Sequence, residues 1–334
     1  MEKISKGSSS ARSGSEETTS SKRNILYGSS SPHLRSEETV SRVMIDVLIA
    51  LLPAALASIY FFRFNAIKLI GLAVITAVVT EWGLQKIMKR PASIKDFSAV
   101  VTGLLLAFNI PASAPWWIPV VGSAFAIAIA KQAFGGLGNN FINPALAARA
   151  MLLASWPVIM TNWVTPGADA ISTATPLAIL KGEAEGTLPS ITKVLVGNIG
   201  GSLGETSALL LILGGLYLLY RGVINWRIPG SYIATVMVMT ILLDGGITNM
   251  IYHTLSGGLM LGAFYMATDY SSSPVTPRGH IIFGIGCGLL TSIIRLYGGY
   301  PEGVSYSILL MNVAAPLIDK YTAPKVFGEV KQNA

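Results

Sequence analysis

The chain has 334 residues, of which 51% are hydrophobic and only 12% are charged, and its mean hydropathy is +0.57. Average soluble domains carry about 25% charged residues, so this composition excludes an ordinary soluble domain and indicates a membrane protein with several spans. The net charge of +7 does not indicate nucleic-acid binding, because the basic residues lie in segments that flank apolar stretches.

The cysteine and histidine content limits the redox chemistry. Cys287 is the only cysteine, and one cysteine makes neither an internal disulfide nor a four-cysteine iron–sulfur cluster. No two of the three histidines (His33, His253 and His280) have metal-ligand spacing on one helix face, although a haem held by histidines from different helices is left open. We therefore predict no metal site and expect any redox cofactor to be organic.

In chain order, a polar segment comes first and apolar segments follow. Residues 1–35 are rich in Ser, Gly, Lys and Glu and contain no apolar run, so we predict a disordered cytoplasmic tail rather than a signal peptide. A membrane domain is predicted over 36–320 and a second cytoplasmic tail over 321–334. Ten apolar segments in the membrane domain are predicted to be helical, at 43–62, 69–88, 97–111, 116–134, 145–160, 207–222, 229–243, 252–268, 280–297 and 304–318.

Several of these segments are shorter than the roughly 20 residues that span a bilayer, which is typical of helices that break inside a protein. The stretch 103–108 resembles 258–264, and two paired-glycine turns are each followed by an asparagine. In a five-plus-five arrangement the matching segments run in opposite directions. The predicted fold is therefore all-α, with about ten transmembrane helices in two inverted five-helix repeats, although such short matches also arise by chance.

Lysines and arginines predict the orientation, because they are enriched in cytoplasmic loops. With the N-terminus inside and ten spans, 18 of them fall on the inner side and 5 on the outer side, while Arg149 lies within a segment and is not assigned. Both termini are therefore predicted to be cytoplasmic, and the loop 161–206 is predicted to face outside.

Charged residues also occur in or at the ends of the apolar segments, where they are costly and often functional. We expect Asp96 and Asp319 to be solvated at the membrane interfaces. Asp46 and Arg149 lie deeper and are a candidate ion pair. The full set is Asp46, Glu81, Asp96, Arg149, Asp269 and Asp319.

A polar stretch in the predicted outer loop reads Asp-Ala-Ile-Ser-Thr-Ala-Thr. A hydroxyl on an accessible segment with small neighbours suits attachment of a phosphate ester, and Ser172, Thr173 and Ala174 are small. With Asp169 upstream, the stretch resembles the signal by which a flavin transferase esterifies FMN to the last threonine, here Thr175. The competing interpretation is an ordinary solvated loop, in which Ser, Thr and Pro are common.

A second stretch, at 135–145, reads Gly-Gly-Leu-Gly-Asn-Asn-Phe-Ile-Asn-Pro-Ala. No strand precedes it, so a phosphate-binding loop is a weak interpretation. Close helix packing is one alternative. The other, which the family resemblance given below implies, is a helix break at the centre of the membrane domain, in which Asn139, Asn140 and Asn143 would satisfy freed backbone groups or line a flavin or ion site.

Four stretches together resemble the family that contains the D subunit of the Rnf complex, a ferredoxin:NAD oxidoreductase, and the B subunit of the sodium-translocating NADH:quinone reductase. They lie at 30–35, 135–145, 169–175 and 267–274, and the last reads Ala-Thr-Asp-Tyr-Ser-Ser-Ser-Pro. The length and the ten predicted spans fit the D subunit. Two departures are Thr173, where the quinone-reductase relatives often have Gly, and the Ser-rich N-terminal extension.

The resemblance implies a subunit of an ion-translocating oxidoreductase in the inner (cytoplasmic) membrane. It would relay electrons through FMN on Thr175 and couple them to movement of Na⁺ or H⁺, with no catalysis by this chain alone. The implied partners are a second flavin-carrying subunit, iron–sulfur subunits and, during maturation, a flavin transferase. A second, non-covalent flavin such as riboflavin is a further expectation. The alternative is a flavin-free channel or transporter for a small neutral solute on the same fold.

The predicted orientation can be tested by labelling. In a Cys287→Ser background, Gly182→Cys is expected to react with a membrane-impermeant maleimide in intact cells, because the charge distribution places the loop 161–206 outside. Lys325→Cys is expected to react only after the membrane is permeabilised. The reverse labelling pattern would overturn the orientation.

Overall fold

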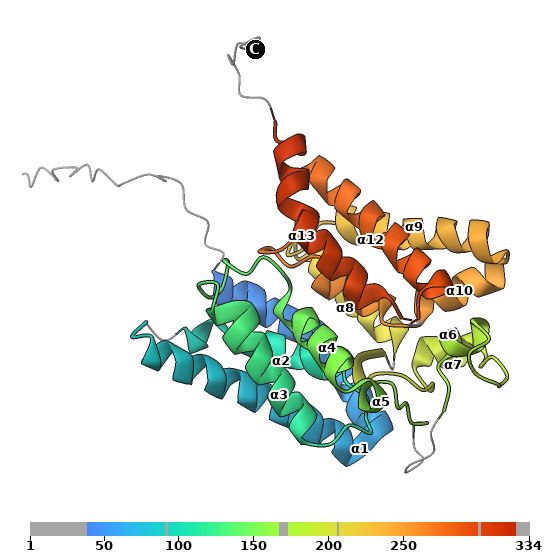
Figure 1. Cartoon of the computed structure of the whole chain (residues 1–334), viewed down its shortest axis with the longest axis horizontal. Helices are drawn as coiled ribbons and strands as arrows, with labels where there is room; N and C mark the ends of the chain where they lie inside the picture. Colours follow the sequence, from blue (N-terminus) through green and yellow to red (C-terminus); the bar gives the residue numbers. More distant parts are fainter. Residues whose placement is uncertain (1–38, 91–92, 167–172, 206, 300–301, 325–334) are drawn as a thin grey trace, which may run out of the picture. The chain divides into compact units, whose positions relative to one another are not determined.

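A computed structural model describes residues 39–90, 93–166, 173–205, 207–299 and 302–324. No strand occurs in these ranges, so the predicted all-α fold is confirmed for them. Two of the elements, η2 and η4, are π-helices, and η1 and η3 are 3₁₀-helices. In chain order the elements are α1 (Val40–Ile87), η1 (Ile94–Asp96), α2 (Ser98–Phe108), α3 (Trp117–Phe125), η2 (Ala126–Gln132), α4 (Pro144–Ser155), α5 (Pro157–Met160), α6 (Pro176–Leu180), α7 (Ile191–Val196), η3 (Leu203–Glu205), α8 (Ala208–Tyr220), α9 (Arg227–Asp244), α10 (Ile247–Leu255), α11 (Leu259–Leu261), η4 (Gly262–Met266), α12 (Pro277–Tyr297) and α13 (Val304–Thr322) (Figure 1).

Three of these helices, α1, α9 and α12, are long and apolar enough to cross a membrane. Shorter apolar helical stretches accompany them at Ser98–Phe108, Trp117–Gln132, Pro144–Ser155 and Ala208–Tyr220. Each of the ten predicted apolar segments coincides with helix, and the segments 145–160 and 252–268 are each divided between helices. The predicted architecture of long and broken apolar helices is therefore present, whereas the count of ten spans and the inverted repeat stay predictions.

The two segments at the start of the membrane domain are joined more directly than predicted. α1 consists of two helices that meet at Arg63, where φ is 49° and ψ is −127°. The apolar segments predicted at 43–62 and 69–88 are therefore joined by one non-helical residue rather than by a loop, and Lys68 is helical. Large apolar side chains such as Leu56 and Ile75 are exposed on both parts of α1, as expected for helices surrounded by lipid.

The glycine-rich stretch after η2 forms the predicted helix break. Gly135, Gly136 and Gly138 have φ angles of 121°, 96° and 88°, which glycine adopts without a steric penalty. Helix resumes at α4, where the Oδ1 of Asn143 accepts hydrogen bonds from the backbone N–H groups two and three residues later, at 3.0 and 3.2 Å. This side chain satisfies two of the donors that the start of a helix leaves free.

A second break lies between α10 and η4, where Gly257 and Gly258 both have a φ of 69°. Beyond it, the hydroxyl of Tyr265 donates to the carbonyl oxygens of Leu211 and Ala50, at 3.0 and 3.3 Å. The π-helix η4 is therefore attached to α8 and to the first part of α1.

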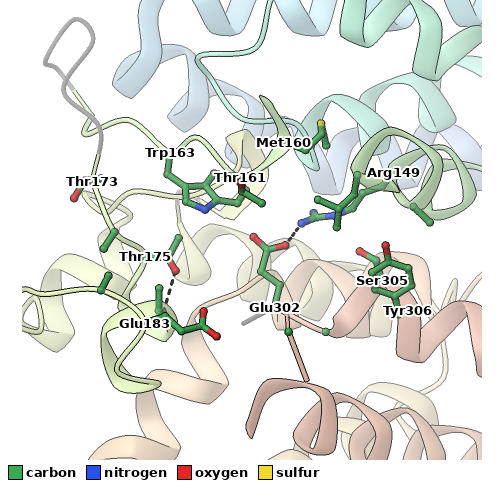
Figure 2. A pocket seen from close by; sticks show the side chains of 17 residues that line it. Arg149, Met160, Thr161, Trp163, Thr173, Thr175, Glu183, Glu302, Ser305 and Tyr306 are labelled. Carbon is green, nitrogen blue, oxygen red and sulfur yellow. Dashed lines mark hydrogen bonds and ion pairs between the residues drawn. The ribbon is translucent and has the colours of Figure 1, made fainter. Parts of the chain in front are cut away.

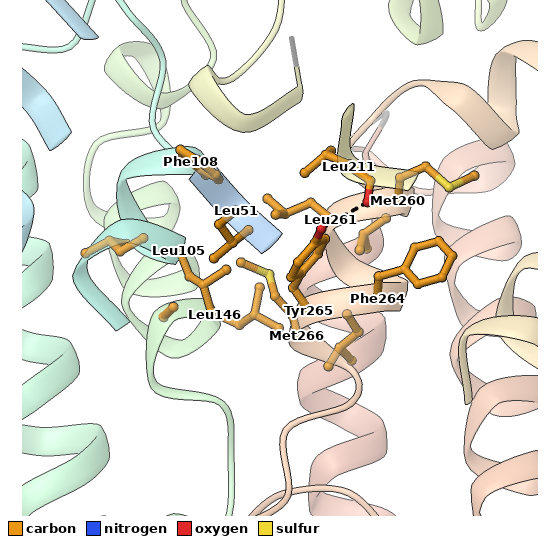
Figure 3. Close-up of a cluster of buried hydrophobic side chains, with 14 of the residues drawn as sticks. Leu51, Leu105, Phe108, Leu146, Leu211, Met260, Leu261, Phe264, Tyr265 and Met266 are labelled. Carbon is orange, nitrogen blue, oxygen red and sulfur yellow. Dashed lines mark hydrogen bonds between the residues drawn. The ribbon is translucent and has the colours of Figure 1, made fainter. Parts of the chain in front are cut away.

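The buried core gathers side chains from both halves of the chain. Asn109, the C-cap of α2, contacts the sulfur of Met266 in η4 at 3.7 Å, so two short helices end against each other inside this core. Further along, α9 packs against α12 and α12 against α13, while α1 contacts α2, α3 and α8. Figure 3 shows the central cluster, which includes Leu51, Leu105, Phe108, Leu146, Leu211, Met260, Leu261, Phe264, Tyr265 and Met266.

Small residues allow the closest helix contacts. A methyl group at Gly103 in α2 would lie 2.9 Å from both the carbonyl oxygen of Ala73 and the Cα of Val74 in α1. Both neighbours are backbone atoms, which do not move aside as a flexible side chain does. The approach of α2 to the second part of α1 therefore requires glycine, as at many packed helix interfaces in membranes.

Gly103→Ala is expected to destabilise the protein by about 1–3 kcal/mol, the usual cost of overpacking. The change should appear as a lower midpoint of thermal unfolding for the detergent-purified protein. Gly71→Ala is the matched control, because a methyl group there meets nothing within 4 Å. Equal midpoints for the two variants would show that α2 and α1 are not in close contact.

Candidate functional site

A cavity of about 450 Å³ lies between the segment that leads into α6, the helix α4 and the start of α13. This volume is within the range of about 300–1,000 Å³ that is typical of ligand sites. Figure 2 shows its side chains, which mix charged, aromatic and hydroxyl groups; they include Arg149, Trp163, Thr175, Glu183, Glu302 and Tyr306. We call it the outer cavity, after the predicted side of the loop that lines it.

Thr175 is the N-cap of α6. Its backbone is extended, with φ −72° and ψ 152°, and its Oγ1 accepts a hydrogen bond from the N–H of Ala178 at 3.2 Å. Pro176 at the first helical position has no N–H to satisfy, which favours a helix start here. The Thr175 side chain lines the cavity, and the residue is only 5% exposed.

The other residues of the predicted attachment signal are only partly described. Thr173 and Ala174 line the same cavity as Thr175. The N–H of Thr173 donates to the carbonyl oxygen of Trp163 at 2.9 Å, and this bond joins two segments of the cavity wall. Asp169 and Ser172 lie outside the described residues.

Arg149 and Glu302 form an ion pair in the wall of the outer cavity. Their side chains are 5% and 15% exposed. The Nη1 of Arg149 also donates to the Oδ1 of Asn109 at 2.7 Å. Figure 2 shows the Arg149 guanidinium pointing toward the Glu302 carboxylate, with Thr175 on the other side of that carboxylate. A positive and a negative charge therefore share one largely enclosed space.

The ion pair predicted between Asp46 and Arg149 is wrong. Asp46 instead accepts hydrogen bonds from the hydroxyl of Tyr217 at 2.9 Å and from the Nη2 of Arg221 at 3.1 Å, from the end of α8 and the residue that caps it. Sequence position indicated the depth of each charge but not its neighbours, because the partner comes from a helix far along the chain.

A buried arginine fixes the backbone beside Glu302. Arg295 is 1% exposed, and its Nε donates to the carbonyl oxygen of Glu302 at 2.8 Å. Its other nitrogens donate to the carbonyl oxygens of His253, Ser256 and Gly257. One guanidinium thus satisfies carbonyl groups at the end of α10 and joins them to the start of α13.

A chain of polar contacts runs from the outer cavity into the protein. Asn109 links Arg149 to Met266, and the carbonyl oxygen of Met266 accepts from the Nδ2 of Asn143 at 3.2 Å. The N–H of Asn143 donates to the Oδ1 of Asn312 at 3.2 Å, and the Nδ2 of Asn312 donates to the carbonyl oxygen of Ser272 at 2.9 Å.

These polar contacts reach a second cavity of about 510 Å³ at Asn143, and we call it the inner cavity. Its walls are mostly apolar and come largely from α1, α2, η4 and the loop that leads into α4. The polar residues on them include Lys131, Asn140, Asn143 and Asp269. Of the three asparagines singled out in the sequence, Asn140 and Asn143 line this cavity, whereas Asn139 is exposed and is not part of either wall.

Asp269 lies in the loop after η4, where burial raises the pKa of its carboxyl above the usual value. Hydrogen bonds oppose this effect: the Oγ of Ser272 and the Nδ2 of Asn140 donate to the Oδ2 of Asp269, at 2.9 and 3.3 Å. The carboxyl group of this half-buried residue therefore binds donors from two segments.

Glu81 is also buried and paired. The Nζ of Lys131 lies 3.0 and 2.9 Å from its two oxygens and 2.6 Å from the Oγ of Ser98. Amide nitrogens of Gln85 and Gln132 complete the surroundings of the carboxylate. The side chains of Lys131 and Glu81 are 2% and 1% exposed.

Asp96 and Asp319 bind nearby backbone at the ends of their helices. The Oδ1 of Asp96 accepts from the N–H of Ser98 at 2.8 Å, and the Oδ1 of Asp319 accepts from the N–H of Val275 at 2.9 Å. The charged cavity residue that the sequence reasoning did not single out is Glu302. A signal was present, because a carboxylate in a short Gly- and Pro-containing turn between two apolar segments is a candidate site residue.

The apolar helices, the two breaks and the charges buried between them define a multi-span membrane protein. The chain belongs to the NQR2, RnfD, RnfE family, whose model matches residues 27–328. It is 56% identical over 309 residues to the D subunit of the Na⁺-translocating ferredoxin:NAD⁺ oxidoreductase complex of Acetobacterium woodii, a match that covers 92% of this chain and 96% of the relative.

Two further relatives extend the comparison. The chain is 49% identical over 323 residues to the D subunit of the proton-translocating ferredoxin:NAD⁺ oxidoreductase complex of Clostridium ljungdahlii, covering 92% of this chain and 97% of that one. It is 37% identical over 341 residues to the D subunit of the ion-translocating oxidoreductase complex of Yersinia pseudotuberculosis serotype O:1b, covering 90% and 97%. The family resemblance inferred from the sequence is confirmed.

Glu81→Gln and Lys131→Met are each expected to destabilise the protein by about 3–5 kcal/mol, because each leaves the partner's charge buried and unpaired. The double variant is expected to be less destabilised than the sum of the two single variants. Unfolding of the detergent-purified proteins measures this coupling. Glu183→Gln is the control, since the Glu183 side chain is 41% exposed beside Lys181 and exposed pairs contribute about 0–1 kcal/mol. Strict additivity at Glu81 and Lys131 would contradict the buried pair.

Proposed function

We propose that this chain is a membrane subunit of an ion-translocating ferredoxin:NAD oxidoreductase complex and that it carries FMN esterified to Thr175. The names of the relatives support the complex, and they include both a Na⁺-translocating and a proton-translocating form. The observation that carries the flavin proposal is the position of Thr175, whose side chain lines a cavity that also contains a buried cation and aromatic side chains.

The residues of the outer cavity fit a flavin mononucleotide. An ester oxygen on Thr175 keeps a lone pair, so it can still accept the hydrogen bond from Ala178 that caps α6. Trp163 and Tyr306 offer flat surfaces, and Arg149 offers a positive charge. The Oε1 of Glu302 is buried and has no hydrogen-bond partner among the described residues, which is unusual for a native protein and suits a site that receives a polar ligand.

A flavin supplies one-electron transfer, and the protein supplies position and electrostatics. Attachment at Thr175 fixes the group at one place in the wall. Met160 and Leu153 provide apolar surface that limits water in the cavity. Asn109 holds Arg149 in position from the side away from the cavity, and Arg295 holds the backbone of Glu302.

The partners follow from this role. Electrons would reach and leave this chain through a second flavin-carrying subunit and iron–sulfur subunits, and their transfer would be coupled to movement of Na⁺ or H⁺. A membrane potential sets the scale of that coupling at about 2.3 kcal/mol per charge per 100 mV. The chain would lie in the cytoplasmic membrane with both termini inside and the Thr175 loop outside, as the basic residues predict.

The inner cavity is the place we propose for a second, non-covalent flavin. It combines a large apolar wall with a few polar groups, among them Asn140 and Asp269, and this is the usual make-up of a small-molecule site. Its polar connection to the outer cavity, through Asn143 and Asn109, gives the two sites a continuous link of hydrogen-bonding groups.

Thr175→Ala is expected to abolish the covalent flavin, because no oxygen remains to form the ester. The protein is made together with its flavin transferase, and the adduct is measured by intact mass and by fluorescence in a denaturing gel. Thr175→Ser should keep the adduct, since it keeps the oxygen. Thr173→Ala is the control for a neighbouring threonine and should keep it as well.

A full adduct in Thr175→Ala would move the attachment site elsewhere, first to Thr173. Absence of any adduct in the unaltered protein made with an active transferase would sink the flavin proposal. A channel or transporter for a small neutral solute would then be the better interpretation.

A further inference from the structure

Arg149 and Glu302 bring two opposite charges into the wall of the outer cavity, and Thr175 lies on the other side of Glu302 (Figure 2). All three residues line the same cavity. A phosphate ester on Thr175 would keep its phosphate within two covalent bonds of the threonine oxygen. The isoalloxazine ring is joined to that phosphate by the ribityl chain, so it would share the cavity with the charged pair.

We propose that Arg149 and Glu302 are positioning residues that set the reduction potential of the flavin in the outer cavity. This inference rests on the proposed attachment of FMN to Thr175. Adding one electron to the ring, without a proton, adds one negative charge to an enclosed space. The electron comes from the flavin-carrying partner subunit. Arg149 compensates the added charge, and Glu302 partly cancels that compensation.

Burial makes these two charges effective. The side chains of Arg149 and Glu302 are 5% and 15% exposed, so water screens them little. The third charged residue in the wall differs: the side chain of Glu183 is 41% exposed and lies 2.8 Å from the Nζ of Lys181. Arg149 and Glu302 are therefore expected to affect the potential of a group in the cavity strongly, and the exposed Glu183 only weakly.

Each of the two charged residues also makes a hydrogen bond to a further residue. Asn109 accepts a hydrogen bond from Arg149 at 2.7 Å, and Arg295 donates to the backbone of Glu302 at 2.8 Å. One carboxylate oxygen of Glu302, Oε1, has no hydrogen-bond partner among the described residues, although it is buried. Oε2 of Glu302 pairs with Arg149, whereas Oε1 remains available to interact with a group in the cavity.

The test is the midpoint potential of the covalent flavin in the detergent-purified full chain, measured by spectroelectrochemical titration. Arg149→Gln should lower the equilibrium constant for one-electron reduction at least about tenfold, and Glu302→Gln should raise it by a similar factor. For one electron, tenfold corresponds to about 59 mV. Arg149→Lys keeps the charge and should restore most of the potential, and Glu183→Gln should change it less than about twofold.

Opposite shifts in Arg149→Gln and Glu302→Gln support the proposal, because loss of structure would not give opposite signs. If both variants carry a full complement of flavin but their potentials are unchanged, or shift in the same direction, the proposed role of the pair is overturned. The proposed attachment at Thr175 is unaffected by that result. Reduced flavin content in Arg149→Gln with an unchanged potential in Glu302→Gln would assign Arg149 to the phosphate and also overturn the proposed role of the pair. If Arg149→Gln does not fold, the Glu302→Gln potential decides alone. An unaltered protein without covalent flavin refutes the proposed function itself, and this inference with it.

Discussion

Helix ends inside a membrane protein need hydrogen-bond partners from the protein, and most of this structure follows from that constraint. At one break, Asn143 caps α4 and also donates to the end of η4. At the other, Arg295 binds three carbonyl oxygens at the end of α10 and beyond. Asn109 performs a similar task at the end of α2. The two asparagines that satisfy broken backbone are thus the same ones that connect the two cavities.

Buried charge is handled in the same way, by partners from distant parts of the chain. Lys131 and Glu81 neutralise each other beside Ser98, and Arg149 is shared between Glu302 and an asparagine. Such pairs add little net stability compared with apolar packing, but loss of one member is costly. Their value is therefore in fixing geometry, and the geometry that Arg149 and Glu302 fix is the wall of the outer cavity.

The sequence predicted what depends on local pattern. Each predicted apolar run falls on helix, although the short helices α6 and α7 lie in the stretch that was predicted as a loop, and glycines at 135–138 located a break whose φ angles only glycine adopts easily. The sequence did not predict which charged side chains form ion pairs. Asp46 binds Arg221 rather than Arg149, and Lys131 pairs with Glu81 in the interior. Such partners depend on how the helices pack, which the spacing of residues does not reveal. Thr175 was singled out because its signal is local, whereas the partners of Glu302 are defined only in the folded chain.

The burial of Thr175 has a consequence for the order of events in biogenesis. Its hydroxyl caps α6 and the residue is 5% exposed, so a transferase that esterified this oxygen as proposed would find little free surface on the packed protein. Under that proposal, modification would take place before the segment around Thr175 packs or during a local opening of it. Each molecule would then be modified in a short window of its assembly, and the cofactor, once attached, would be enclosed as the loop packs.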